Sequence, residues 1–209
     1  MDDSEFDRAL VAAAFRLAGE QGWSRMTIAE AARRADLPLD RARARFPARP
    51  MLLLRFGSIA DQAALSLATS EGSHRDRLFD ILMRRIDVLQ AHRDGVLALL
   101  RGLRTDPCST GLVTLANLRS MMWMLDGAGI RSTGVFGLLR AKGLMAVWLS
   151  VVHAWRNDAS QDLSATMAAL DKALSRAEQV EGWLRGRRRA PPADPPLAEP
   201  PGEPPPPPE

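Results

Sequence analysis

The residues best suited to chemistry are the arginines between residues 25 and 55. This stretch holds eight arginines and three acidic residues, a net charge of +5, whereas the whole chain of 209 residues carries only +3. Guanidinium groups pair with phosphates and with guanine edges, so the stretch predicts a polyanionic partner. A solvated basic surface without a partner is the alternative. The eight are Arg25, Arg33, Arg34, Arg41, Arg43, Arg45, Arg49 and Arg55.

Two short helices are expected to position these arginines. Thr27 can cap a helix over residues 28–35, with Glu30 at the third position after the cap, as in a capping box. Residues 36–38, which include a proline, end that helix, and a second one is expected over residues 39–46. Such a helix, turn and helix cannot bury their own apolar faces, so an N-terminal helix must complete their core.

The second helix of this pair carries three of the arginines. A helix fits the major groove of DNA, where arginines reach phosphates and guanine edges. Arg41 and Arg45 are four residues apart and share a face, whereas Arg43 lies roughly opposite. We therefore expect Arg41 and Arg45 to contact DNA and Arg43 to lie at the flank. Thr27 can offer a helix-terminal amide to one phosphate, and Arg49 can bind another.

The segment from Trp23 to Leu54 resembles the DNA-binding part of the TetR family of transcriptional regulators. The resemblance implies a homodimer, a DNA-binding repressor, and modulation by a lipophilic ligand within a helical bundle. It departs from the family at Asp36, where a glycine is usual, and at Arg43, where an aromatic residue is usual. The matching positions are Thr27, Ala32, Ala35, Leu37, Phe46, Pro47, Arg49 and Leu52.

The remainder of the chain predicts more helices and an all-α fold of about nine helices, because no segment alternates with a period of two. We expect a helix-turn-helix domain at 1–47, a ligand-binding and dimerisation bundle at 48–189, and a disordered tail at 190–209, which holds eleven of the fifteen prolines. The other helices are expected from Ser4 or Asp3 to Gly22, over about 49–69, along the apolar face of Leu78, Leu82, Ile86 and Leu89, and over 93–103, 109–128, 133–156 and 160–185. In the TetR resemblance the last two of these form most of the dimer.

Residues 75–175 also resemble a family of ubiquinone-biosynthesis accessory proteins that has the TetR fold. This second resemblance implies an isoprenoid-lipid-binding protein that works at a membrane surface with a hydroxylase. The basic helix-turn-helix is better formed than that family needs, so the regulator is the leading hypothesis and the accessory protein the alternative. The residues behind this resemblance are Arg119, Trp123, Gly129, Trp155, Asp158, Asp162, Thr166 and Asp171.

Both resemblances imply an apolar cavity in the bundle. Methionine and tryptophan recur on the helices expected at 109–128 and 133–156, and these side chains suit an adaptable pocket for a lipophilic ligand. Ordinary core packing is the alternative for each of them. The predicted lining consists of Met121, Met124, Met145, Trp148 and Val152.

Other classes of protein are disfavoured. The single cysteine, Cys108, has no histidine near it in sequence, and neither a metal-ligand spacing nor a phosphate-binding glycine motif occurs, so we expect no enzyme, metal or cofactor. The longest apolar run, residues 143–155, is too short to span a membrane and predicts a buried helix. With no signal sequence, a cytoplasmic protein is expected. Trp183 and the four arginines at 185–189 suit peripheral contact with an anionic membrane, although a solvated helix end explains them equally well.

Overall fold

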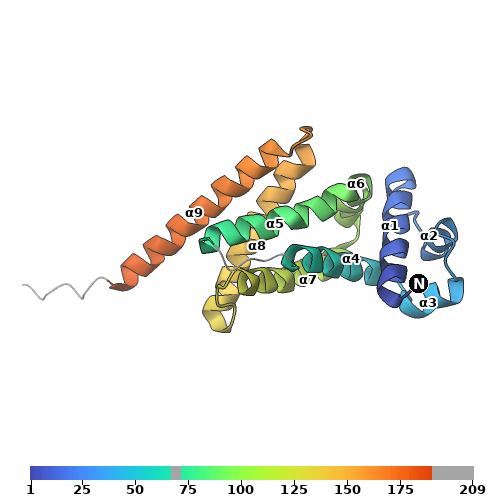
Figure 1. Ribbon diagram of the computed structural model, residues 1–209, viewed down its shortest axis with the longest axis horizontal. Helices are drawn as coiled ribbons and strands as arrows, with labels where there is room; N and C mark the ends of the chain where they lie inside the picture. Colours follow the sequence, from blue (N-terminus) through green and yellow to red (C-terminus); the bar gives the residue numbers. More distant parts are fainter. Residues whose placement is uncertain (67–71, 190–209) are drawn as a thin grey trace, which may run out of the picture.

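The computed structural model describes residues 1–66 and 72–189, without the side chains of 181–189. This part of the chain contains nine α-helices, a short 3-10 turn and no strand, which confirms the all-α fold. Figure 1 shows α1–α3 grouped at one end of an elongated molecule, with α8 and α9 toward the other. The helices are α1 (Asp3–Gln21), α2 (Ile28–Arg34), α3 (Leu39–Arg45), α4 (Arg49–Leu65), α5 (His74–Ala91), α6 (Arg93–Gly102), α7 (Pro107–Gly127), α8 (Gly134–Asn157) and α9 (Ser164–Arg189), and the 3-10 turn is Leu103–Thr105.

The first two helices are fixed by side-chain caps. Asp2, one residue before the expected position, caps α1: its carboxylate accepts from the Glu5 amide at 2.7 Å, and the Glu5 carboxylate accepts from the Asp2 amide at 2.9 Å. Thr27 caps α2 as expected, since its hydroxyl accepts from the Glu30 amide at 3.2 Å. The Glu30 carboxylate accepts instead from Gln21 Nε2 at 3.3 Å, which ties α2 to the end of α1.

Two later boundaries differ from expectation for local reasons. Pro107 starts α7, with Asp106 as its cap, because the first turn of a helix needs no N–H from that position. The last helix begins four residues later than the expected residue 160 because the Asp158 carboxylate organises the preceding loop. It accepts from the Ser160 amide at 3.0 Å and from the Thr166 amide and hydroxyl at 2.8 and 2.7 Å, and these bonds hold the pKa of Asp158 far below its usual range.

A single hydrophobic core runs through the described residues, from the N-terminal helices into the bundle. The proposed boundary at residue 47 is therefore not a gap in the packing, and it stays a prediction. His92, between α5 and α6, lies 5.9 Å from the ring of Phe15 and 5.7 Å from that of Phe56, and so joins the two regions. Among the largest fully buried side chains are Phe6, Leu10, Phe15, Leu52, Ile81, Leu82, Met121, Met124 and Trp155.

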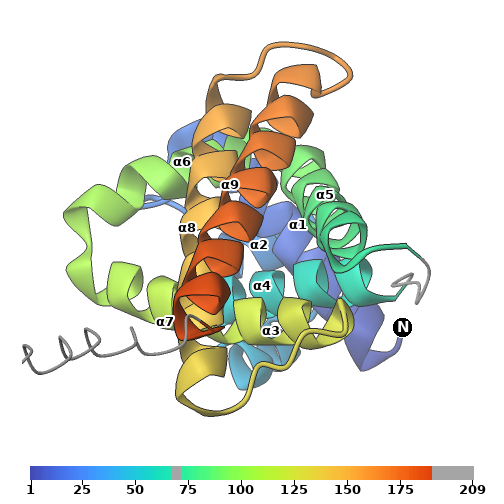
Figure 2. The same ribbon diagram turned by 90° about the vertical axis from the view of Figure 1, so that its left-hand side faces the viewer.

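The apolar segment expected to be a buried helix is longer and more exposed than predicted. It belongs to the 24-residue α8, which by length and composition alone could cross a membrane, with a mean hydropathy of 1.6 over the relevant window. Only 33% of that window is buried, so the expectation is wrong for the outer face of the helix. Val135, Leu139 and Leu149 are exposed on it. Figure 2 shows α8 and α9 side by side along one face of the molecule.

Helix α1 also packs closely on α6. At Gly95 a β-carbon would lie 2.2 Å from the backbone oxygen of Phe15, a distance that real atoms do not tolerate. The backbones of α1 and α6 therefore touch at this point, and only glycine fits there.

Replacing Gly95 with alanine should lower the free energy of unfolding by about 1–3 kcal/mol, because the added methyl forces two packed backbones apart. Chemical denaturation monitored by circular dichroism measures this. The matched control is Gly111→Ala in α7, where a β-carbon meets nothing within 4 Å. That change should be neutral or stabilising by up to about 1 kcal/mol. Equal stability of the two variants would contradict the close contact.

Candidate nucleic-acid interface

The candidate interface is the pair α2 and α3 with the turn between them. The amide of Leu37 donates to the carbonyl of Ala32 at 2.9 Å, which closes the turn, and Leu37 is buried. Asp36 adopts a φ of 53°, in the left-handed region where glycine is preferred. A glycine would adopt this φ without strain, and in this chain an aspartate adopts it.

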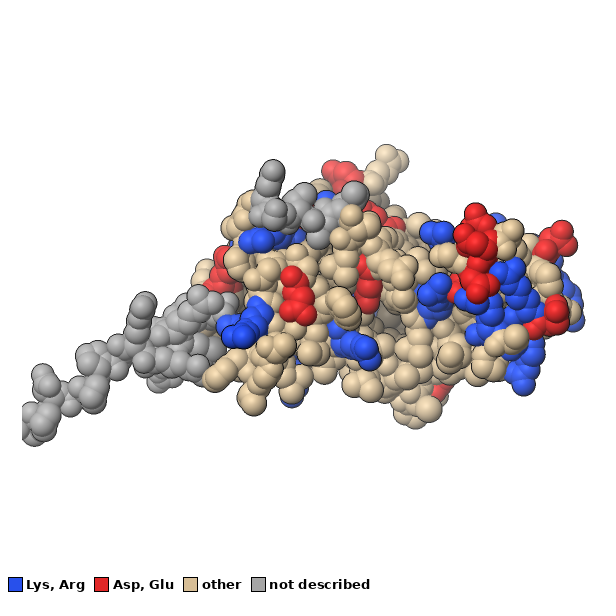
Figure 3. Space-filling model, turned by 60° about the horizontal axis from the view of Figure 1, so that its bottom comes forward, with Lys and Arg blue, Asp and Glu red and all other residues tan. Residues whose placement is uncertain are grey.

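The third helix is held against the molecule by one face only. Ala42 and Phe46 are buried in the core, whereas Leu39, Asp40 and Arg43 are exposed. Between the two faces lie Arg41 and Arg45, which the sequence predicts to be the principal DNA contacts. In Figure 3 basic side chains are densest at the end formed by α1–α3, with acidic side chains among them.

Those acidic partners come from α1. Arg45 binds Asp7 through two hydrogen bonds, of 2.6 Å from Nε and 2.8 Å from Nη2, and its Nη1 lies 2.6 Å from Asp3. Arg41 donates to Asp3 at 2.6 Å and stacks over the ring of Phe6. The bonds with Asp7 raise the pKa of Arg45, and the bond from Arg41 lowers the pKa of Asp3. DNA contact by Arg41 and Arg45 stays a prediction, and it requires these ion pairs to open.

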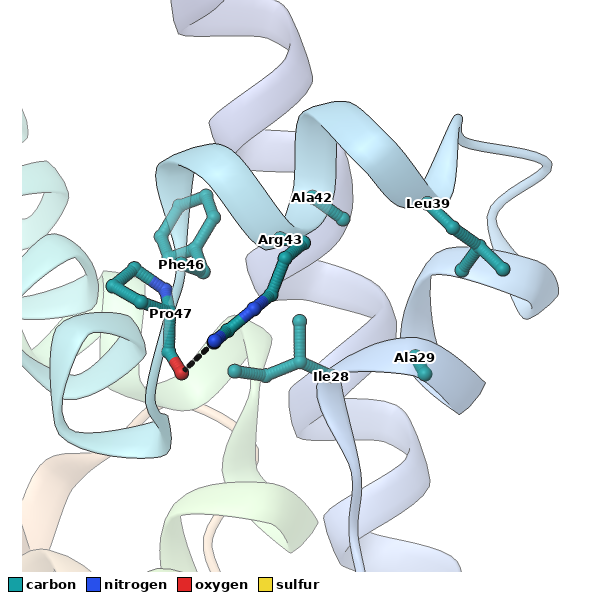
Figure 4. A pocket seen from close by; sticks show the side chains of 7 residues that line it. All are labelled: Ile28, Ala29, Leu39, Ala42, Arg43, Phe46 and Pro47. Carbon is teal, nitrogen blue, oxygen red and sulfur yellow. Dashed lines mark hydrogen bonds between the residues drawn. The ribbon is translucent and has the colours of Figure 1, made fainter.

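Arg43 has the opposite environment. Its side chain lies along the exposed face of α3, and Nη1 donates to the carbonyl of Pro47 at 2.7 Å, an uncharged acceptor (Figure 4). The side chain borders a shallow hollow of about 340 Å³ between α2 and α3. Apolar groups and this guanidinium form its wall, namely Ile28, Ala29, Leu39, Ala42, Arg43, Phe46 and Pro47.

Comparison with solved structures identifies the arrangement. A TetR transcriptional regulator from Nitrosomonas europaea ATCC 19718 superposes with a TM-score of 0.71 at 20% sequence identity, covering 84% of this chain and 99% of that chain. The chain has the TetR fold. A TetR transcriptional regulator from Rhodococcus sp. RHA1 is also similar, with a TM-score of 0.58 at 21% identity over 84% of this chain and 97% of that chain. No protein-family model and no curated protein matches the sequence.

Within this TetR fold, Arg49 opens α4 as expected, but its guanidinium is engaged. Nη1 donates to the carbonyls of Ser24 at 2.9 Å and Trp23 at 3.3 Å, so the side chain ties α4 to the connection between α1 and α2. The phosphate contacts predicted for Arg49 and for the amide of Thr27 stay predictions. Thr27 itself is exposed at the start of α2.

The predicted ligand-lining residues lie within the packed bundle of the TetR fold. Met121, Met124 and Trp148 are buried, and Met145 and Val152 are partly buried against the same core. The hollow between α2 and α3 and a second hollow bordered by Asp7, Arg45 and Arg55 lie at the helix-turn-helix end, and neither touches these five residues. Ligand binding by these residues stays a prediction.

Sequence reasoning missed a charged residue among them. Arg85 of α5 is 3% exposed, and its guanidinium lies 4.6 Å from the ring of Trp148. Its Nη2 donates to Asn117 Oδ1 at 3.1 Å, and its Nε lies 3.0 Å from Asp61 of α4. A signal for it existed: Arg85 falls three residues after Leu82, on the apolar face of the amphipathic helix.

Most residues behind the ubiquinone-accessory resemblance have structural roles here. Trp155 donates through Nε1 to Gln90 at 2.8 Å, which joins α8 to α5, and Asp171 pairs with Arg75 at 2.5 Å, which joins α9 to α5. Together with the Asp158 loop, these contacts stabilise the bundle whatever its activity. Among the residues that the structure describes, no cluster of three histidine, cysteine or acidic residues could hold a metal ion.

Proposed function

We propose that the protein is a DNA-binding transcriptional regulator of the TetR type, acting in the cytoplasm as a repressor that a ligand in the bundle modulates. One observation carries the proposal: in a chain with the TetR fold, α3 is anchored by Ala42 and Phe46 and turns Arg43 outward. An anchored helix with a guanidinium on its free face is suited to the major groove.

The contacts divide into two kinds. Arg43 exchanges the carbonyl of Pro47 for a base edge, which supplies sequence readout. Arg41 and Arg45 exchange carboxylates of α1 for phosphates at the groove edge, which adds affinity without specificity. The acidic residues of α1 thus lower the non-specific attraction of the helix-turn-helix for any DNA.

DNA binding is tested with fluorescence anisotropy, using duplexes from the region upstream of the protein's own gene and a scrambled duplex of the same composition. We expect the protein to bind the upstream duplex at 50 mM salt. If six or more phosphates are contacted, the affinity should fall about 10³-fold or more at 200 mM salt. If the protein binds neither duplex at 50 mM salt, the proposal of a DNA-binding regulator is rejected.

A homodimer is the second part of the proposal. The outer face of α8, with α9 beside it, exposes apolar side chains. A second copy of the chain can cover them by packing its own α8 and α9 against this face. Such a dimer has two α3 helices, one for each of two successive major grooves. These side chains include Val135, Leu138, Leu139 and Leu149 of α8 and Val180 of α9.

Replacing Leu149 with arginine should weaken the dimer at least tenfold, because the symmetry of the interface buries two unpaired charges. Size-exclusion chromatography with light scattering, over a range of protein concentrations, measures this. Met51→Arg on α4, where the side chain is similarly exposed, is the control and should leave the association unchanged. A dimer that tolerates Leu149→Arg does not use this face.

The accessory-protein alternative keeps one supporting observation, the same exposed apolar face of α8. Val135, Leu139 and Leu149 could enter the interfacial region of a bilayer instead of a dimer. The membrane contact expected of Trp183 and the arginines after it falls on side chains outside the described residues. Flotation with anionic liposomes and an isoprenoid lipid in the mass spectrum of the purified protein would favour this alternative over the regulator.

A further inference from the structure

Arg85 is a cation inside the bundle whose hydrogen-bonding capacity is only partly used. Its Nη2 reaches Asn117, but Nη1 is buried and has no acceptor within the described structure. The Nε of Arg85 and an oxygen of Asp61 lie at ion-pair distance, yet neither atom makes a hydrogen bond. Burial lowers the pKa of Arg85 while the charge of Asp61 opposes this effect, and a guanidinium stays protonated in either case.

The unpaired nitrogen narrows the class of ligand. Buried donors that lack acceptors are unfavourable, and a guanidinium is best satisfied by the two oxygens of a carboxylate. Besides Asp61 and Asn117, the Trp148 ring lies over the guanidinium, and the buried Met121 follows Asn117 by one turn of α7. A neutral isoprenoid would leave Nη1 unpaired, and a doubly charged phosphate would bring more charge than one arginine balances.

We propose that Arg85 is the receptor for the carboxylate of an acidic, largely apolar ligand that enters the bundle and makes room by repacking Met121 and Met124. The proposal rests on the ligand-modulated regulator and names its ligand class. The same contact connects to the DNA-binding end, because Asp61 belongs to α4, the helix that follows the helix-turn-helix. A ligand carboxylate displaces Asp61 from Arg85. Asp61, the more exposed of the two side chains, then keeps the hydrogen bond that it already accepts from Ser120 and turns its other oxygen to water.

The test uses the full chain without DNA and two probes of matched length, decanoate and 1-decanol, both below the micelle-forming concentration of decanoate. Isothermal titration calorimetry should show decanoate binding at least tenfold more tightly than 1-decanol. Arg85→Gln should reduce the affinity for decanoate to that for 1-decanol, and Arg85→Lys, which keeps the charge but not the planar fork, should give an intermediate value. Arg77→Gln, on the same helix but with a partly exposed guanidinium that is hydrogen-bonded to Ser73 and His74, is the control and should keep the preference for the acid.

The wild-type preference for the acid tests the proposal even if Arg85→Gln fails to fold. Equal affinity for the two probes, no binding of either, or a decanoate preference that survives Arg85→Gln would overturn the proposal. DNA anisotropy with added decanoate separates this result from the proposed function. If the protein binds decanoate through Arg85 but does not bind DNA, the proposed regulator function is refuted and the proposed carboxylate site stands.

Discussion

Asp7→Asn should lower the free energy of unfolding by about 2–3 kcal/mol, because the charge-assisted hydrogen bonds that this carboxylate accepts are lost together. Asp7 is 2% exposed and lies within 2.6–2.8 Å of nitrogens on both Arg45 and Arg55. The amide fills the same space but leaves Arg55 without its carboxylate partner and Arg45 with Asp3 alone. Both arginines are partly exposed, and solvent screening keeps the loss below that of a fully buried pair.

Urea denaturation at neutral pH measures this loss, and Asp3→Asn is the control. Asp3 also binds two arginines, but its side chain is mostly exposed, so its replacement should change stability little. If Asp7→Asn were as stable as the wild type, the carboxylate would not be the point at which α1, α3 and α4 are joined.

Arg43→Ala should weaken specific DNA binding about 10- to 100-fold, since a side chain that reads a base edge contributes about 1–3 kcal/mol of discrimination. The affinity for scrambled DNA should change much less, so the variant loses specificity more than attraction. Anisotropy with the two duplexes gives both values. Arg156→Ala, at the C-terminal end of α8, removes an equal charge outside the helix-turn-helix and is the control.

The same assay separates Arg43 from its neighbours. Asp3→Asn frees Arg41 and Arg45 from one carboxylate and should raise the affinity for scrambled DNA, with a steeper dependence on salt. If Arg43→Ala leaves the specific complex unchanged while Arg41→Ala abolishes it, the original assignment from helical spacing is correct, and the outward position of Arg43 has no role in readout.

The helix-turn-helix could be predicted because its signals are local in sequence. The Thr27 cap and the residues that end α2 lie within a few positions of the bonds they make, and these bonds are present. The direction of the arginines could not be predicted in the same way. Spacing places Arg41 and Arg45 on one face, as found, but which face points outward depends on carboxylates 38 residues earlier in the chain.

The bundle illustrates a second limit of sequence. Periodicity marks apolar residues on α8 but does not tell whether the protein's own core or another surface covers them, and the inner and outer faces of α8 read alike. Arg85 is the opposite example: a charged residue is expected to be exposed, whereas the packing of the bundle buries this one. Met121 and Met124 are buried, as both the ligand-lining and the core interpretation require, so burial alone does not distinguish the two.

The contact between Gly95 and Phe15 has a mechanical consequence. Two backbones that touch without intervening side chains cannot slide past each other through changes of rotamer. We therefore expect α1 and α6 to move together. Asp7 joins α3 and α4 to α1 through Arg45 and Arg55, so the coupling between α1 and α6 extends to α3 while the Arg45 ion pair is closed. In the proposed regulator, a ligand-induced displacement of α6 would therefore move α1 with it, and α1 would carry α3.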